Sequence, residues 1–257
     1  MSASVKIEVR ECSESAESCV IRDLQPDIVN VWVRTLQVPS AIESTCYEVL
    51  TSEERERAGR YRVGRPRNDF ILTRGTLRSL LARYVGKTPQ ELSLRYSEYG
   101  KPILDGPFDL RFNVSHTDGL ALIAIVRARE IGIDVEKIHA AQDARKLAER
   151  FFSVRECHFL EGLSGEELQV AFFRCWTRKE AYVKARGEGL SLPLHQFDVS
   201  VAPNEFRALL ATRPDPSEAG RWILQDLPVS HGYVAALAVA ETTDDKRAQN
   251  ATLTRVE

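Results

Sequence analysis

The sequence predicts an α+β fold, and the spacing of its apolar residues supports this prediction. Two apolar runs, at Leu120–Val126 and Ile131–Val135, are typical of buried strands that follow one another along the chain. The segments Asn68–Tyr84 and Leu168–Arg186 place large apolar residues at helical spacing, and glycine follows each of them. We therefore expect long helices that cover the faces of a sheet.

A repeated motif predicts that the fold consists of two similar halves. Asn113-Val-Ser-His116 precedes an apolar run, and Pro228-Val-Ser-His231 precedes another one. A long helix lies upstream of each motif, although a chance match of short apolar strands competes with this interpretation. We expect halves spanning residues 1–130 and 131–257, related by a pseudo-twofold axis, with the active site in the cleft between them.

The remaining elements follow from local signals. Ile28–Val33 alternates as a strand does, and Thr51 or Ser52 is placed to cap a charged helix. Two further helices are expected at Ala141–Phe152 and Arg155–Glu161, and the polar tail from about Thr242 is expected to be frayed.

The composition argues against several classes of function. The chain has 257 residues, of which 43% are hydrophobic, and 35 basic residues nearly balance 37 acidic ones. This balance predicts neither a nucleic-acid nor a membrane partner, and no apolar stretch reaches the roughly 18 residues of a membrane span. The amino terminus lacks the apolar core of a secretory signal. Five cysteines without a CxxC spacing indicate reduced thiols, so we expect a cytoplasmic protein.

Asp134 and Glu136 are the strongest candidates for chemistry. They lie two residues apart at the end of an apolar strand, so their side chains share one face. Two like charges held there repel each other unless a cation or protons lie between them. A divalent metal would resolve this repulsion, whereas a strand-end pair with surface partners is the alternative.

Glu180 is a third candidate, and several cations accompany the acids. Glu180 follows Trp176 by four positions on the Leu168–Arg186 helix, but an ordinary ion pair with Lys184 on a solvated face explains it equally well. Three acids without a histidine cluster suit Mg²⁺ better than zinc. Candidate phosphate contacts are Arg74, Arg78, Lys101 and His116, although the histidine alone is more often structural and the arginines are more often solvated.

Several motifs occur in the order seen in 4′-phosphopantetheinyl transferases, and the chain resembles this family over residues 51 to 200. The motifs are Tyr99-Gly-Lys-Pro, Phe112-Asn-Val-Ser-His, Gly132-Ile-Asp-Val-Glu, Phe151-Phe-Ser-Val-Arg-Glu and Trp176-Thr-Arg-Lys-Glu-Ala-Tyr-Val-Lys. The length resembles the surfactin-type, pseudo-dimeric monomers. The resemblance implies transfer of 4′-phosphopantetheine from coenzyme A to a serine of an acyl or peptidyl carrier protein, with release of adenosine 3′,5′-bisphosphate. A coenzyme A- or carrier-binding module without catalysis is the alternative.

The resemblance also implies roles for individual residues. Mg²⁺, or Mn²⁺ in its place, would be held by Asp134, Glu136 and Glu180. Coenzyme A would be bound by Arg74, Lys101, Ser115, His116 and Lys184, with Lys184 at the pyrophosphate and His116 and Arg74 at the 3′-phosphate. Further basic contacts are expected among Arg60, Arg62, Arg65 and Arg67, without a choice between them.

The resemblance leaves the general base and the carrier surface open. Glu180, Glu156 or water would take the proton of the carrier serine. Because carriers are acidic around that serine, we expect an exposed basic or apolar strip near the Leu168–Arg186 helix that includes Arg178 and Arg186. Asp118 would oppose a phosphate if it pointed inward, and we expect it to face solvent.

Overall fold

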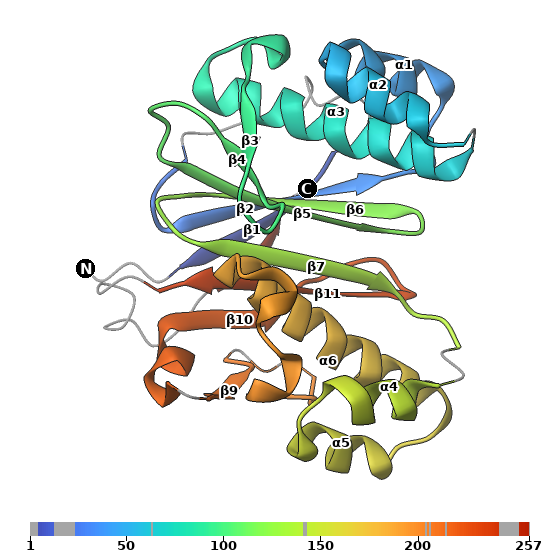
Figure 1. The fold of residues 1–257 in the computed structure, drawn as a ribbon, viewed down its shortest axis with the longest axis vertical. Coiled ribbons are helices and arrows are strands. Elements are labelled where there is room, and N and C mark those ends of the chain that lie inside the picture. Colours follow the sequence, from blue (N-terminus) through green and yellow to red (C-terminus); the bar gives the residue numbers. More distant parts are fainter. Residues whose placement is uncertain are drawn as a thin grey trace.

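The computed structural model describes residues 5–12, 24–62, 64–140, 143–203, 205, 207–213, 215–241 and 252–256. It is a mixed α+β structure, as predicted, with two main sheets (Figure 1). The five-stranded sheet has the order β12 (Thr252–Val256), β1 (Lys6–Glu11), β2 (Ile28–Thr35), β6 (Leu120–Arg127) and β5 (Leu110–Thr117). The three-stranded sheet has the order β10 (Trp222–Asp226), β11 (Tyr233–Ala240) and β7 (Ile131–Lys137). Two short hairpins are β3 (Leu94–Tyr96) with β4 (Pro102–Leu104), and β8 (Phe197–Val199) with β9 (Leu209–Thr212).

The helices occupy the outer faces of the sheets. They are α1 (Ser40–Glu48), α2 (Ser52–Arg60), α3 (Arg65–Val85), α4 (Ala144–Phe151), α5 (Val154–Glu161) and α6 (Gly165–Arg186). Short 3-10 turns lie at η1 (Pro89–Glu91), η2 (Gly189–Ser191), η3 (Leu194–Gln196) and η4 (Pro216–Arg221). None of the helices in the described residues combines the length and apolar character that crossing a membrane requires.

Among the described residues, the three largest apolar clusters hold these layers together. One core fills the space between the two sheets, where the valines of β1 and β2 meet the isoleucines of β7 and the apolar residues of β11. A second core packs α3 against the outer face of the five-stranded sheet, and a third packs α6 against β10 and β11 (Figure 1). The strands β6 and β7 are almost continuously buried because both of their faces are covered.

The helix boundaries follow the local signals in the sequence. Of the two predicted capping residues, Thr51 is the one that caps α2, and it forms a capping box with Glu54. Gly86 and Gly187 adopt left-handed conformations that end α3 and α6. Helix α3 begins earlier than predicted, at Arg65, because Pro66 is well suited to its first turn.

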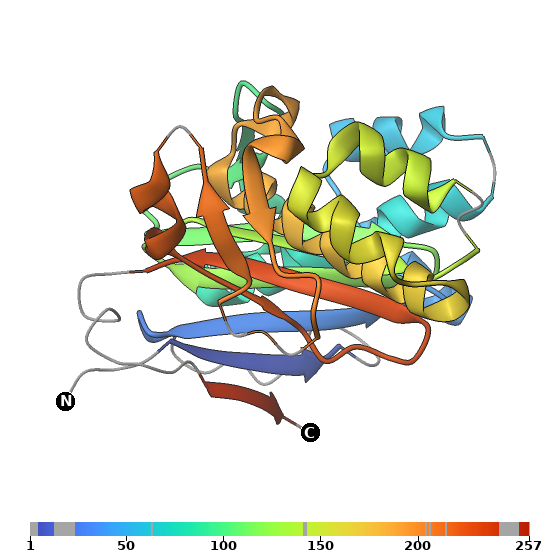
Figure 2. The ribbon, with the colours of Figure 1, turned by 90° about the horizontal axis from the view of Figure 1, so that it is seen from below.

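The carboxy-terminal segment departs in part from the expectation of a frayed tail. Residues 252–256 form β12, which pairs in parallel with β1 at the outer edge of the five-stranded sheet (Figure 2). Residues 242–251 lie outside the described residues. The expected border at residue 130 falls in the short connection between β6 and β7, but β12 belongs to the second half of the sequence and completes the sheet of the first.

Candidate active site

The acidic residues gather where β5, β7 and α6 meet. Alternation along β7 places Asp134 and Glu136 on one face, and α6 brings Glu180 and Lys184 towards them. The Lys184 ammonium donates to Asp134 Oδ1 over 2.6 Å and to the hydroxyl of Ser115 over 3.1 Å. The Ser115 hydroxyl in turn donates to the same Asp134 oxygen over 2.8 Å. Asp134 is therefore the centre of the cluster.

The cluster has more negative than positive charge, because Lys184 is paired with Asp134 while Glu136 and Glu180 lie nearby. Burial raises the pKa of Glu180 and of Glu136, and the charge of Asp134 raises both further. Among the described residues, the second oxygen of Asp134, Oδ2, has no hydrogen-bond donor although it is buried. Within the same part of the chain, no three acidic, histidine or cysteine side chains form a ready-made metal site. The three carboxylates are thus electrostatic neighbours without being assembled around a common point.

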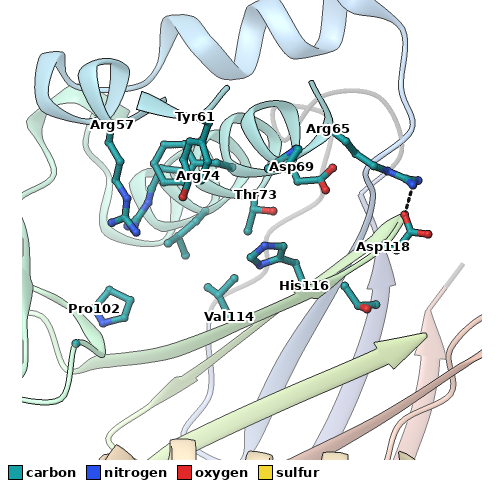
Figure 3. A pocket seen from close by; sticks show the side chains of 15 residues that line it. Arg57, Tyr61, Arg65, Asp69, Thr73, Arg74, Pro102, Val114, His116 and Asp118 are labelled. Carbon is teal, nitrogen blue, oxygen red and sulfur yellow. Dashed lines mark ion pairs between the residues drawn. The ribbon is translucent and has the colours of Figure 1, made fainter. Parts of the chain in front are cut away.

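A cavity of about 800 Å³ opens beside this cluster, between α2, α3 and β5 (Figure 3). Its polar lining includes Arg57, Tyr61, Arg65, Asp69, Thr73, Arg74, His116, Thr117 and Asp118. The guanidinium groups of Arg57 and Arg74 each lie over the ring of Phe70, and His116 points into the middle of the cavity (Figure 3). The Thr117 hydroxyl lies 3.4 Å from Glu136 Oε2, so the cavity reaches the acidic cluster.

Two donors that line the cavity have no partner within the described residues. The hydroxyl of Thr73 and the Nη1 atom of Arg74 are both buried and make no hydrogen bond there. The other guanidinium nitrogens of Arg74 contact Tyr96, at 3.0 Å, and Glu54, at 3.6 Å, which fixes the orientation of the group. Unsatisfied buried donors are costly, and an anion in the cavity would satisfy both.

His116 lies at the floor of the cavity in a mixed electrostatic environment. Burial lowers its pKa, the carboxylate of Asp69 opposes this effect, and the charge of Lys184 adds to it. Burial raises the pKa of Asp69, which also lines the cavity. An anion placed next to His116 would favour its protonated form.

A smaller cavity of about 280 Å³ separates the first half of the chain from α6. It is lined by Tyr99, Asn113, Glu180 and Lys184, among others. Lys101 also lines it, but its ammonium donates to the backbone carbonyls of Ile131 and Lys184, each over 2.9 Å. The side chain of Lys101 therefore ties the loop after β3 to β7 and α6, and its nitrogen is not directed at a free phosphate position.

The structure separates the basic residues that the sequence could not rank. Arg65 lines the large cavity, whereas Arg67 contacts Glu43, and Arg60 and Arg62 are exposed outside the cavity lining. Arg57 also lines it, although the sequence analysis did not select this residue. Its position three residues after Glu54, whose side chain faces α3, is the helical spacing that could have identified it.

The expectation that Asp118 faces solvent holds only in part, because 39% of its side chain is exposed while it also lines the mouth of the cavity. Asp118 lines the cavity, where it forms ion pairs with Arg65 and, at 2.7 Å, with Lys137 (Figure 3). These two cations hold the pKa of Asp118 below its usual value, through the Lys137 hydrogen bond first. Its charge is thereby compensated, and it holds Arg65 at the mouth of the cavity.

Glu156 is not placed to act as a general base. Only 1% of it is exposed, and its Oε2 accepts from Lys179 and from the Ser153 backbone, each over 2.8 Å. Its Oε1 accepts from the Val199 backbone over 2.7 Å. Because both oxygens of this buried carboxylate are hydrogen-bonded, it cannot reach a substrate. Its contacts with Lys179 and Val199 instead connect α5 to α6 and β8.

The expected exposed strip with Arg178 and Arg186 is also wrong. Arg178 is fully buried and donates to Asp226 and to the Ser200 carbonyl. Arg186 contacts Tyr182, Glu188 and Glu218. Both guanidinium groups are used inside this chain.

Replacement of Glu156 by glutamine should lower the free energy of unfolding by about 3 kcal/mol, because it leaves the Lys179 charge buried without a counter-charge. Urea unfolding followed by circular dichroism measures this change. The double variant Glu156→Gln/Lys179→Met should recover much of the loss, since the buried charge is then gone. Equal stability of the single variant and the original chain would contradict the role as a fastening residue.

Comparisons with known proteins agree on one family. The profile of the 4′-phosphopantetheinyl transferase superfamily matches residues 130–238, and the profile of the 4′-phosphopantetheinyl transferase N-terminal family matches residues 39–127. The 4′-phosphopantetheinyl transferase HetI of a Nostoc species is 39% identical over 220 residues, which cover 84% of this chain and 90% of HetI. A putative 4′-phosphopantetheinyl transferase of Synechocystis, slr0495, is 37% identical over 70% of this chain and 73% of its own length.

Proteins with lower sequence identity to this chain have related descriptions. The 4′-phosphopantetheinyl transferase Sfp of Bacillus subtilis is 32% identical over 58% of this chain and 66% of its own length. A solved structure of a holo-(acyl-carrier-protein) synthase from Bacillus anthracis, in complex with CoA (3′,5′-ADP), covers 44% of this chain and 96% of its own at 25% identity. Its TM-score of 0.35 is too low to place residues of this site.

Proposed function

Because this chain belongs to the 4′-phosphopantetheinyl transferase superfamily, we propose that its large cavity and acidic cluster together carry out transfer from coenzyme A to a carrier-protein serine. The serine oxygen attacks the phosphorus that carries the pantetheine arm. The bond from this phosphorus to the bridging oxygen breaks, adenosine 3′,5′-bisphosphate leaves with that oxygen, and the serine proton passes to a base. The reaction needs a site for the phosphates, compensation of the charge on the leaving group, and a base.

We assign the phosphate site to the large cavity because buried hydrogen-bond donors without a partner line it. Thr73 and Arg74 have donors that an anion would satisfy, and Arg57 and His116 add positive charge or a further hydrogen bond. A cavity of about 800 Å³ is within the usual range for a ligand of this size. We assign the 3′-phosphate end of coenzyme A to this cavity, with the pyrophosphate directed past Thr117 towards Lys184 and the acids.

The chemistry of the carboxylate donors in the acidic cluster suits a divalent cation. The donor-free oxygen of Asp134 and the raised pKa values of Glu136 and Glu180 indicate carboxylates whose charge a cation would compensate. We propose that these three residues hold Mg²⁺ or Mn²⁺. The bound ion would compensate the charge that develops on the departing phosphate. Lys184, which pairs with Asp134, would meet the pyrophosphate of coenzyme A next to this ion.

With Glu156 buried, Glu180 or a water molecule beside it remains as the base. Glu180 lines the smaller cavity at the border between the two halves, which gives it or a water molecule beside it access to the carrier serine.

We also propose that the two halves arose from one unit, since α3 and α6 cover opposite sheets in comparable positions. The nearly balanced charge favours a protein partner over a nucleic acid or a membrane. The cysteine pattern and the length favour a monomer in the cytoplasm.

Intact-mass measurement of an apo carrier protein incubated with the enzyme, coenzyme A and Mg²⁺ tests the function directly. Addition of a phosphopantetheine mass to the carrier supports the proposal. A folded chain that binds coenzyme A but leaves every carrier of a fatty-acid, polyketide and nonribosomal-peptide panel unmodified would favour the alternative, a binding module without catalysis.

Replacement of His116 by alanine should weaken the use of coenzyme A by about 10-fold in kcat/KM, because one contact to a charged phosphate is lost. The loss should be much smaller with 3′-dephospho-coenzyme A, which has no 3′-phosphate for this residue to contact. Steady-state transfer rates with both substrates measure the difference. Equal losses with the two substrates would show that His116 does not serve the 3′-phosphate.

We place the carrier protein on α4 and α5 rather than on α6. Three of the six large hydrophobic side chains exposed among the described residues lie there: Leu147, Val154 and Phe159. The exposed side chains of Arg150 and Arg155 accompany them, which suits the acidic surface around a carrier serine. In the order of the chain, α4 is the first helix after β7, the strand that carries Asp134 and Glu136.

Replacement of Val154 by glutamate should raise the KM for an acidic carrier by about 10-fold, because apolar contact is lost and like charges meet. The fold should be unaffected since 88% of Val154 is exposed. Leu210→Glu, at an exposed leucine of β9, serves as the matched control. An unchanged KM for the carrier in Val154→Glu would move the docking surface elsewhere.

A further inference from the structure

The two sheets meet at β5 and β7 through side chains. The backbone of β5 pairs with β6, and the backbone of β7 pairs with β11, so each strand is the edge of its own sheet. The strands nevertheless lie side by side. Across the junction, three side chains of β5 accept from backbone N–H groups of β7: Asn113 from Ile133 over 2.9 Å, Ser115 from Val135 over 3.3 Å, and Thr117 from Lys137 over 3.3 Å.

Two of these three contacts also involve a carboxylate of the acidic cluster. The Ser115 hydroxyl accepts from the backbone of Val135 and donates to Asp134 over 2.8 Å. The Thr117 hydroxyl accepts from the backbone of Lys137 and donates to Glu136, over 3.4 Å. A hydroxyl has one proton to give and two lone pairs to receive, so one group can hold a backbone N–H and orient the carboxylate before it.

The third contact lacks this second function. Asn113 accepts from Ile133, and the residue before Ile133 is Gly132, which has no side chain to orient. The Asn113 contact can therefore serve as a control, because it joins the two sheets as the other two contacts do but does not reach an acid.

The two carboxylate oxygens of Asp134 therefore differ in their hydrogen bonds. Oδ1 receives both Ser115 and Lys184, whereas Oδ2 meets no donor among the described residues. Ser115 is itself buried and its hydroxyl is fully occupied, so it is poorly placed for the coenzyme A contact that the family resemblance implied.

We propose that Ser115 and Thr117 are positioning residues that orient the Asp134 and Glu136 carboxylates towards the divalent cation, each by a hydroxyl that also fastens β7 to β5. This inference rests on the proposed function, because it takes those two acids as cation ligands. Groups that orient metal ligands typically contribute 10- to 100-fold to metal affinity.

The test measures the dissociation constant of Mn²⁺ by electron paramagnetic resonance, at saturating coenzyme A and without a carrier protein. The variants are Ser115→Ala, Thr117→Val and Thr117→Ser, with Asn113→Ala as the control that removes a junction contact opposite a glycine. Thermal unfolding of each variant is measured in parallel.

We expect Ser115→Ala and Thr117→Val to weaken Mn²⁺ binding by about 10- to 100-fold, and Thr117→Ser to restore affinity close to that of the original chain. Asn113→Ala should lower the unfolding temperature while Mn²⁺ affinity changes less than about 2-fold, since no acid depends on it. Mn²⁺ affinity that is the same in all four variants, with normal binding by the original chain, would overturn the positioning role alone. Absence of Mn²⁺ binding by the original chain would overturn the proposed cation site as well.

Discussion

Replacement of Asp134 by asparagine should reduce phosphopantetheine transfer by at least about 10³-fold, which corresponds to roughly 4 kcal/mol of transition-state stabilisation. The residue is the centre of the acidic cluster, since Ser115, Lys184 and the charges of both neighbouring glutamates converge on it. Asparagine keeps the shape of the side chain but offers one neutral oxygen where a carboxylate would meet a cation.

The chain should remain folded in this variant because two electrostatic changes offset each other. The ion pair with Lys184 is lost, but the charge that raises the pKa of Glu136 and Glu180 is lost too. Intact-mass assays of carrier modification measure the rate, and circular dichroism checks the fold. Asp143→Asn, an exposed acid paired with Lys146 at the start of α4, is the matched control. Near-normal transfer by Asp134→Asn would remove the cation site from the mechanism, and an unfolded variant would make Asp134 structural.

The sequence could predict those parts of the site that depend on local periodicity. Asp134 and Glu136 share a face because strand residues alternate, and the strand itself is evident from its apolar neighbours. The position of Glu180 on α6 follows from helical spacing and from the glycine that ends the helix.

The sequence could not predict which charged residues are occupied inside the fold. Glu156, Lys101 and Arg178 belong to motifs that look catalytic, yet each is bound to groups that are distant in the sequence. Tertiary packing decides whether a charged side chain binds a substrate or a group of the protein itself. The spacing of residues along the sequence does not contain this information. The same reason explains why β12 was missed: a polar strand at a sheet edge has little apolar pattern, and its partner β1 lies at the other end of the chain.

The backbone of α6 lies very close to β7 at Gly132, so we expect a substitution there to have a large effect on transfer. A Cβ atom added at Gly132 would lie 2.1 Å from the carbonyl oxygen of Ala181 and 2.3 Å from the backbone nitrogen of Ala185. Both are backbone atoms of α6, which no side-chain rotation can move away. Ala181 and Ala185 directly follow Glu180 and Lys184, so any shift of the helix moves these two functional side chains relative to Asp134.

Gly132→Ala should therefore reduce transfer by at least about 10²-fold, since displacement of reacting groups by about 1 Å has an effect of this size. It should also lower stability by about 1–3 kcal/mol, as overpacking does. Carrier modification rates and urea unfolding measure the two effects. Gly220→Ala is the matched control, because a Cβ there meets no atom within 4 Å and its backbone is outside the left-handed region. A loss of stability without a loss of transfer rate in Gly132→Ala would contradict this prediction. The close packing of α6 on β7 would then stabilise the fold but would not determine the distance between Asp134 and the side chains of Glu180 and Lys184.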